Sequence, residues 1–308
     1  RRHHGVSGTQ VRVTMDPATP PSNDDSELVS IGTPTAWVII RVLVESPEDI
    51  KTARELQHGI TVTAPATHPQ TRTERAGRAT TIAQAGAEYF AELKRYIDLD
   101  PPAHWHPRLS PAAQAIVDNP SSVATKVLAA GVAEGEQLIL RGNGSDAVKR
   151  NGWSTGRAAT GSGDDILKRA VGAKFGLGGH QAIENRSYAA QADAQGNRID
   201  GTKPLTLRFA ADNKPPCSAF WSLTAYGPDM YLVENAIDRW SISDRTPDLN
   251  YDGDGGLTIT LSYEQPTAMT NWLPVPAGPY LLGLRVYEGH DEVVNCAWFP
   301  PTLYPAND

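Results

Sequence analysis

The sequence predicts a mixed α+β protein, in which a mainly helical N-terminal region precedes a C-terminal antiparallel β-sandwich that is jelly-roll-like. Three observations support this fold class. The apolar pattern has a helical period before Asp193 and a period of two after it. The chain contains 24 prolines and 27 glycines, which divide the second part into short segments. Its 308 residues are also enough for two domains.

The chain is expected to divide into three parts. Residues 1–35 are polar and contain four prolines, so we expect an extended polar arm. Residues 36–150 are expected to form the mainly helical region, and residues 151–308 the β-sandwich domain. The helical region opens with an apolar run over 36–44, which has the length of one buried strand.

The helices of the second part are predicted from caps, prolines and spacing. Ser46-Pro47-Glu48-Asp49 combines a capping serine, a first-turn proline and two acids. The expected helices lie over 47–57, over 80–97 with an end before Pro101-Pro102, and within 162–182. Two further short helices are expected within 110–130. Asn119-Pro120 separates them, and the second ends before Gly131.

The strands of the third part are predicted from apolar residues at alternate positions, the pattern of an antiparallel sheet with one buried face. Clusters rich in Pro, Gly, Asp and Asn separate the runs. The three alternating sets are Leu205, Leu207 and Phe209; Leu257, Ile259, Leu261 and Tyr263; and Tyr280, Leu282, Leu284 and Val286.

Composition excludes several classes of function. The formal net charge of −7 argues against nucleic acid as a partner. No apolar run reaches 18 residues, so no transmembrane segment is expected. The sequence has no phosphate loop, dinucleotide fingerprint, serine-hydrolase elbow or zinc-helix motif, so we expect no cofactor and can name no catalytic residue.

The two cysteines, Cys217 and Cys296, both fall in the predicted sandwich. They could pair as a disulfide in an oxidising compartment, or remain as two buried thiols. The sequence leaves both alternatives open, because distance cannot be judged from spacing.

A series of motifs in residues 151–301 resembles the family called domain of unknown function 1214. The motifs are Asn151-Gly152-Trp153, Lys168-Arg169-Ala170-Val171, Asp193-Ala194-Gln195-Gly196-Asn197, Leu207-Arg208-Phe209, the long Pro215–Tyr226 segment, Glu234–Ile242, Asp254–Ile259, Asn271–Gly278 and Leu284-Arg285-Val286-Tyr287. The chain departs from the family pattern at Ala236 and Trp240, where proline and tyrosine are usual.

Residues 36–140 resemble the tail of a companion family, domain of unknown function 1254, in a shortened form. The resemblance implies a tandem β-sandwich architecture and, because such proteins are often exported, a location outside the cytoplasm, periplasmic or secreted. It implies no activity.

A candidate ligand site is predicted in the connections of the sandwich, where functional residues tend to lie. Arg239 and Arg245 could hold a carboxylate or sugar hydroxyls, with Asp244 orienting an arginine. Asn271 and Trp272 lie in another connection, and tryptophan and tyrosine rings such as Trp272 and Tyr226 can stack on sugars. The alternatives are a salt-bridged corner and aromatic residues that fill the core.

Two metal-like patterns are interpreted as structural. The stretch from Asp248 to Asp254 matches the first half of a calcium loop, but Ile259 stands where the bidentate acid should be, so we expect a turn. His104 and His106 form a close pair in a proline-flanked loop, and we expect no metal there.

Three functions remain open. The first is an exported or cell-envelope protein that binds a carbohydrate or small ligand. The second is a structural protein that forms homo-oligomers through the sandwich and the arm. The third is an enzyme acting on glycans, for which Glu234, Asp238 and Glu264 are candidates by residue type only.

Overall fold

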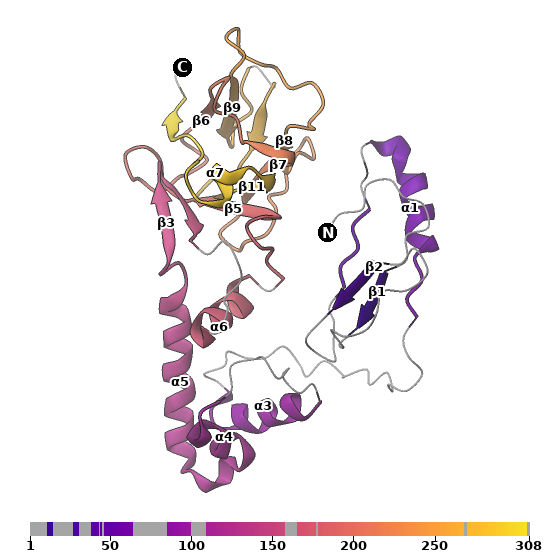
Figure 1. The fold of residues 1–308 in the computed structure, drawn as a ribbon. Helices are drawn as coiled ribbons and strands as arrows, with labels where there is room; N and C mark the ends of the chain where they lie inside the picture. The colour runs from indigo at the N-terminus through magenta and orange to yellow at the C-terminus, as the bar shows by residue number, and fades with distance from the viewer. Residues whose placement is uncertain are drawn as a thin grey trace. The chain divides into compact units, whose positions relative to one another are not determined.

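The computed structural model describes residues 11–14, 27–30, 38–42, 44, 46–63, 85–99, 109–157, 165–176, 178–267 and 270–306. Residue contacts divide the chain into an N-terminal unit, Arg1–Glu136, and a C-terminal unit, Gln137–Asp308. Figure 1 shows the ribbon coloured along the sequence. The fold class is mixed α+β, as predicted, with helices in the N-terminal part and packed antiparallel sheets in the C-terminal part.

The N-terminal unit contains one short parallel strand pair and several helices. Its elements are β1 (Val11–Thr14), β2 (Glu27–Ser30), η1 (Pro47–Asp49), α1 (Ile50–Gly59), α3 (Glu88–Leu99), α4 (Pro111–Asp118), η2 (Pro120–Ser122) and α5 (Thr125–Gly142), which continues into the C-terminal unit. The hydroxyl of Ser110 accepts from the Ala113 amide at 3.2 Å, which is the predicted cap of α4.

One expectation for the N-terminal unit is corrected. The run over 36–44 was expected to be a buried strand, but its described residues are not in a strand, and Val38, Ile39 and Ile40 are more than half exposed. A strand is stable only when a neighbour pairs with it, and the described strands of this unit, β1 and β2, pair with each other. Both of these strands come from the stretch 1–35.

Helix α5 is longer than predicted. It continues through Gly131, where we expected it to end, and through Gly135 as far as Gly142. A glycine inside a helix costs only about 1 kcal/mol relative to alanine. Packing of Leu128 and Val132, both buried, outweighs that local preference.

The C-terminal unit is built from two antiparallel sheets. Its elements are β3 (Ala147–Arg150), β4 (Trp153–Gly156), α6 (Ile166–Phe175), β5 (Asn185–Ala190), β6 (Leu205–Phe209), β7 (Cys217–Tyr226), β8 (Ser241–Ser243), β9 (Leu257–Ser262), β10 (Trp272–Pro274), β11 (Leu281–Gly289), α7 (Asp291–Val294) and β12 (Leu303–Pro305). The strand orders are β3-β4-β5-β11-β7-β8 in the six-stranded sheet and β10-β9-β6-β12 in the four-stranded sheet. One pair, β9 with β10, is parallel.

The sheet begins earlier in the chain than predicted. Strands β3, β4 and β5 all precede Asp193, where we expected period-two structure to start. Strands β3 and β4 have four residues each, which is too short for alternation to be recognised in the sequence. The jelly-roll description remains a prediction.

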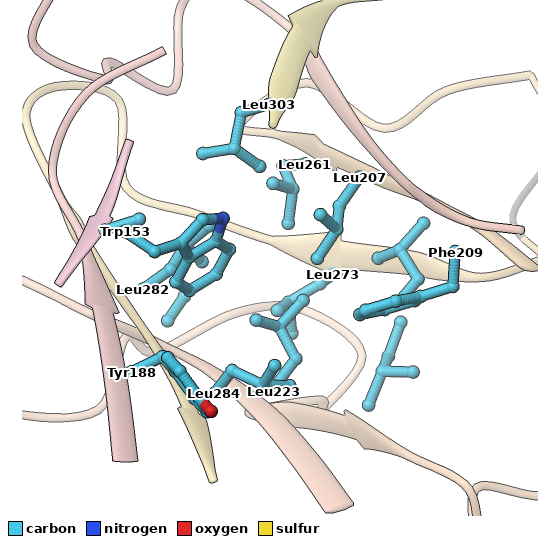
Figure 2. Close-up of a cluster of buried hydrophobic side chains, with 14 of the residues drawn as sticks. Trp153, Tyr188, Leu207, Phe209, Leu223, Leu261, Leu273, Leu282, Leu284 and Leu303 are labelled. Atoms are coloured by element: carbon cyan, nitrogen blue, oxygen red, sulfur yellow. The ribbon is translucent and has the colours of Figure 1, made fainter. Parts of the chain in front are cut away.

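The core lies between the two sheets, and Figure 2 shows side chains from both converging there. Leu207, Leu261 and Leu303 come from the four-stranded sheet, while Tyr188 and Leu284 come from the six-stranded sheet. The three predicted alternating sets are buried, with one correction. Tyr263 is 52% exposed, because β9 ends at Ser262 and the preceding serine is buried instead.

Strand β11 occupies the centre of the six-stranded sheet, hydrogen-bonded to β5 on one side and β7 on the other. Its even-numbered residues Leu282, Leu284 and Val286 point into the core. Odd-numbered residues therefore point to the opposite face, which we call the outer face of the six-stranded sheet.

Candidate functional site

Arg239 and Asn271 line one shallow pocket of about 220 Å³ in the C-terminal unit, together with Ile242, Thr246, Pro247, Asp248, Leu249 and Thr270. A guanidinium nitrogen of Arg239 donates to the main-chain oxygen of Trp272 at 3.0 Å. The structure thus brings Arg239, Asn271 and the Trp272 backbone together. Asp244, Arg245 and Tyr226 do not line this pocket.

Asn271 and Trp272 make structural hydrogen bonds. The Asn271 amide nitrogen donates to the main-chain oxygens of Asn250 (2.6 Å) and Thr258 (3.0 Å), and its Oδ1 accepts from the Asn250 amide. The Trp272 side chain is buried, and its Nε1 donates to the Ser262 carbonyl at 3.1 Å. The Trp272 ring is therefore not a surface for stacking on a ligand.

Asp244 and Arg245 lie against β7. Asp244 Oδ1 accepts from the Trp221 amide at 3.1 Å, so this carboxylate is hydrogen-bonded to the middle of β7. Partial desolvation raises the pKa of Asp244, and the hydrogen bond from Trp221 partly offsets that rise. Arg245 donates to the Ala219 carbonyl at 3.5 Å, and its guanidinium carbon lies 4.5 Å from the Phe220 ring centroid.

Phe220 and Tyr287 form an aromatic pair on the outer face of the six-stranded sheet. They are register partners on β7 and β11, and their rings stack with centroids 4.3 Å apart and an interplanar angle of 14°. His180 approaches the edge of Tyr287 with centroids 6.5 Å apart. Arg245, Phe220, Tyr287 and His180 thus form one continuous row.

Tyr226 lies at the other end of β7 and contacts Arg285 on the same face. The guanidinium carbon of Arg285 lies 5.4 Å from the Tyr226 ring centroid, and both residues are half-buried. Gly283 leaves room for this contact. A Cβ atom at Gly283 would lie 3.2 Å from Tyr226 Cε2 and 3.3 Å from Arg285 Nη1, tighter than ordinary packing.

Hydroxyl groups flank Arg285 on both neighbouring strands. Its register partners are Ser222 on β7 and Ser187 on β5, and Thr224 pairs with Gly283 in the next row. Strand β8 adds Ser243 beside Ser222. Before the register shift between Tyr287 and Gly289, the outward positions of β5, β7 and β11 contain no Asp or Glu, and Arg285 is the charged residue among them.

Two segments match known families. Residues 184–291 match the family described as "Protein of unknown function (DUF1214)", and residues 1–64 match "Protein of unknown function (DUF1254)". The chain combines DUF1254 and DUF1214 regions. The DUF1254 match overlaps the predicted segment 36–140 over 36–64 and also includes the stretch we expected to be an arm. No curated protein matches the chain.

Two solved structures are similar to the chain. The VPA0106 protein from Vibrio parahaemolyticus has 19% sequence identity and a TM-score of 0.58, with 98% of this chain and 77% of that chain covered. A putative uncharacterized protein from Burkholderia cenocepacia has 15% identity and a TM-score of 0.30, with 74% of this chain and 51% of that chain covered. The first similarity supports the fold alone.

All six residues of the predicted site, and Arg285, lie inside the DUF1214 region. Sequence reasoning named Tyr226 but missed Arg285, which it quoted only as part of a family motif. The available signal was the alternation Leu282, Leu284, Val286, which places Arg285 on the outer face of a strand whose other face is buried.

The two metal-like patterns have different outcomes. Asp252 accepts from Arg208 Nε at 3.2 Å and from the Thr258 hydroxyl at 2.8 Å, and Asp254 also pairs with Arg208. These carboxylates therefore stabilise a turn, which is the structural role we expected for this stretch. His104 and His106 lie outside the described residues. Among the residues that the structure does describe, no group of three or more His, Cys, Asp or Glu could hold a metal ion.

Cys217 and Cys296 are free thiols, both half-buried. Glu234, Asp238 and Glu264 are exposed and do not line the pocket. Within the described part of the chain, no helix is long and apolar enough to cross a membrane.

Proposed function

We propose that the DUF1214 region binds a hydroxylated small ligand, of the carbohydrate class, on the outer face of the six-stranded sheet. The observation that carries this proposal is the half-buried Tyr226 ring beside Arg285 and Gly283, with hydroxyls on both neighbouring strands. An aromatic ring offers a flat apolar surface to a sugar, and serine and threonine hydroxyls can donate to or accept from sugar hydroxyls.

The Arg239–Asn271 pocket supports this function less well. Its polar side chains already donate to main-chain oxygens, so fewer of their donors remain for a ligand. Arg239 and Asn271 are better explained as residues that fix the connections around β10. Tyr226 is the member of the predicted set whose ring remains partly open to solvent.

Glycan binding before and after substitution tests the proposal. Tyr226→Ala should weaken binding of a glycan found on an array at least about tenfold, which corresponds to roughly 1.4 kcal/mol. Tyr226→Phe, which keeps the ring, should bind nearly as the wild type. Tyr263→Ala is the matched control, since Tyr263 is an exposed tyrosine just after β9 of the other sheet. Equal binding by Tyr226→Ala and the wild type would refute the proposal.

A second candidate function is self-association through the N-terminal unit. It is favoured by Val38, Ile39, Ile40 and Val44, which are apolar and exposed within one short segment. Light scattering tests it, because a homo-oligomer has a mass that is a multiple of 33.2 kDa. Ile40→Asp should reduce that mass to the monomer value, and a monomeric wild type would contradict this candidate.

We further propose that the protein acts outside the cytoplasm, periplasmic or secreted. The support is the resemblance to families that are often exported. Cell fractionation of the natural gene product tests this location, and recovery of the protein only with cytoplasmic markers would contradict it.

A further inference from the structure

We infer that the ligand of the outer face carries a carboxylate, as in a glycan containing uronic acids, and that Arg285 binds it. This inference rests on the proposed carbohydrate-binding function and specifies its substrate class. It is carried by the position of the Arg285 side chain, by its hydrogen-bonding state and by the absence of acids around it.

The Arg285 side chain is held in place before any ligand arrives. Its guanidinium group lies against the Tyr226 ring and over Gly283, in a space that a single methyl group at residue 283 would narrow. The φ angle of Gly283 is not in the left-handed region, so glycine is needed there for space and not for backbone conformation. A pre-placed cation loses less conformational entropy on binding than a freely moving one.

No described residue accepts a hydrogen bond from the Arg285 guanidinium. Among the described residues, its guanidinium makes the contact with Tyr226 but no hydrogen bond or ion pair. Four other arginines of the C-terminal unit are engaged: Arg150 with the Ala297 carbonyl, Arg186 with the Val294 carbonyl, Arg208 with Asp252 and Asp254, and Arg239 with the Trp272 carbonyl. No Arg285 nitrogen is among the buried side-chain atoms that lack a partner, so these donors remain open to water or to a ligand.

The surroundings of Arg285 favour an anion. The protein has a net charge of −7, yet the outward positions of β5, β7 and β11 before the register shift at Tyr287 contain no acid. An anionic ligand would therefore meet no carboxylate at these positions. The planar guanidinium can donate two parallel hydrogen bonds to a carboxylate, which a neutral sugar cannot accept in that form.

Hydroxyls beside Arg285 suit the rest of a sugar acid. Ser222 and Ser187 are the register partners of Arg285 on the two neighbouring strands, Thr224 pairs with Gly283 beneath the guanidinium, and Ser243 extends the row of Ser222. A uronic acid presents hydroxyls on the ring carbons next to its carboxylate. One row of the sheet therefore offers an arginine for the acid and serines for the adjacent hydroxyls.

Paired oligosaccharides test the inference. The probes are oligogalacturonates and oligomannuronates, each compared with the same oligomer after its carboxyl groups are reduced to alcohols. By calorimetry at low ionic strength, the wild type should bind an acidic oligomer at least about tenfold more tightly than its reduced form. Arg285→Gln should remove this preference, because the affinity for the acidic oligomer should fall to that for its reduced form.

Two further variants separate Arg285 from general effects. Gly283→Ala keeps every charge but displaces the guanidinium, so it should also reduce the preference for the acidic oligomer. Arg208→Gln removes one positive charge from the other sheet and should leave the preference intact. The unfolding temperature of each variant shows whether the domain still folds.

The outcomes distinguish this inference from the proposed function. Equal binding of acidic and reduced oligomers by the wild type overturns the inference and leaves carbohydrate binding standing. No binding of either form refutes both. A preference for the acidic oligomer that survives Arg285→Gln, or that Arg208→Gln also removes, assigns the effect to overall charge and overturns the inference.

Discussion

The two units of the chain differ most in how much apolar surface they bury. In the C-terminal unit, two sheets enclose a continuous cluster that includes Trp153, Tyr188, Phe209, Leu223 and Leu282 (Figure 2). In the described part of the N-terminal unit, the buried apolar residues are Ala53, Val117, Leu128 and Val132. Apolar residues are present in both units, so composition does not explain the difference.

The difference lies in whether apolar residues are placed where a partner can cover them. Val38, Ile39 and Ile40 are as apolar as Leu257, Ile259 and Leu261. The second set alternates with polar residues and faces another sheet, whereas the first is consecutive and has no neighbouring strand among the described residues. Burial of a side chain therefore depends on whether another layer covers its face of the strand, and not on its own hydrophobicity alone.

The largest expected effect compares one isoleucine from each unit. Ile259 is fully buried and Ile40 is 54% exposed. Ile259→Ala should lower the free energy of unfolding by about 2–5 kcal/mol, because it removes buried methyl groups and leaves a cavity. Ile40→Ala should change it by less than about 0.5 kcal/mol. Denaturant unfolding followed by tryptophan fluorescence measures both.

Similar losses of unfolding free energy in Ile259→Ala and Ile40→Ala would contradict the contrast between the two units. A large effect of Ile40→Ala would mean that the segment 38–44 is covered in solution, for example in an oligomer. Repeating the measurement at several protein concentrations separates these explanations, since the stability of an oligomer depends on concentration.

Sequence patterns predicted the sandwich better than they predicted the candidate site. Alternation over 205–209, 257–261 and 280–286 identified the buried faces, because a strand with one covered face has a period of two. Strands β3 and β4 were missed, since four residues carry too little periodicity. The apolar run over 36–44 was misassigned, because a run of that length says nothing about the presence of a pairing strand.

The site was harder to predict because it depends on which residues the fold brings together. Trp272 was expected to stack on a ligand, but its ring is buried and bonded to Ser262. Arg285 is 59 positions from Tyr226 in the sequence, and only the pairing of β7 with β11 places them on one face. Local spacing carries no information about that contact.

The second prediction sharpens the comparison within the C-terminal core. Tyr188 and Tyr280 are both buried, but the Tyr188 hydroxyl donates to the Trp298 carbonyl at 3.2 Å, while the Tyr280 hydroxyl has no partner among the described residues. Tyr188→Phe should lower the free energy of unfolding by about 1 kcal/mol. Tyr280→Phe should leave it unchanged or raise it by about 1 kcal/mol, because a desolvated hydroxyl is removed.

Thermal or denaturant unfolding of the two phenylalanine variants measures this contrast. The substitutions remove the same atom from the same residue type, so each variant is the control for the other. A loss in Tyr280→Phe as large as that in Tyr188→Phe would show that the Tyr280 hydroxyl is hydrogen-bonded in solution.

A third expected effect uses pH to probe the same packed interior. Burial raises the pKa of the Cys217 thiol from its ordinary value of 9.0 to about 11, and nearby Asp244 adds to the rise. The folded state therefore favours the neutral thiol. Below about pH 9 the thiol is neutral in both states and its contribution to stability is fully present. Between pH 9 and about pH 11 the unfolded chain ionises first, so this contribution is lost as pH rises.

The free energy of unfolding of the wild type should thus fall more between pH 8 and pH 11 than that of Cys217→Ala. Both cysteines lie in the C-terminal unit, so this thiol effect reports on that unit alone. Buried tyrosines also lose stability at high pH, since burial raises the pKa of Tyr188 and Tyr280, but they are common to both proteins and cancel in the difference. Denaturant unfolding at intervals of one pH unit measures the difference in unfolding free energy between the wild type and Cys217→Ala. A difference that stays constant with pH would mean that the Cys217 thiol is solvated, and that the packed interior ends before this end of β7.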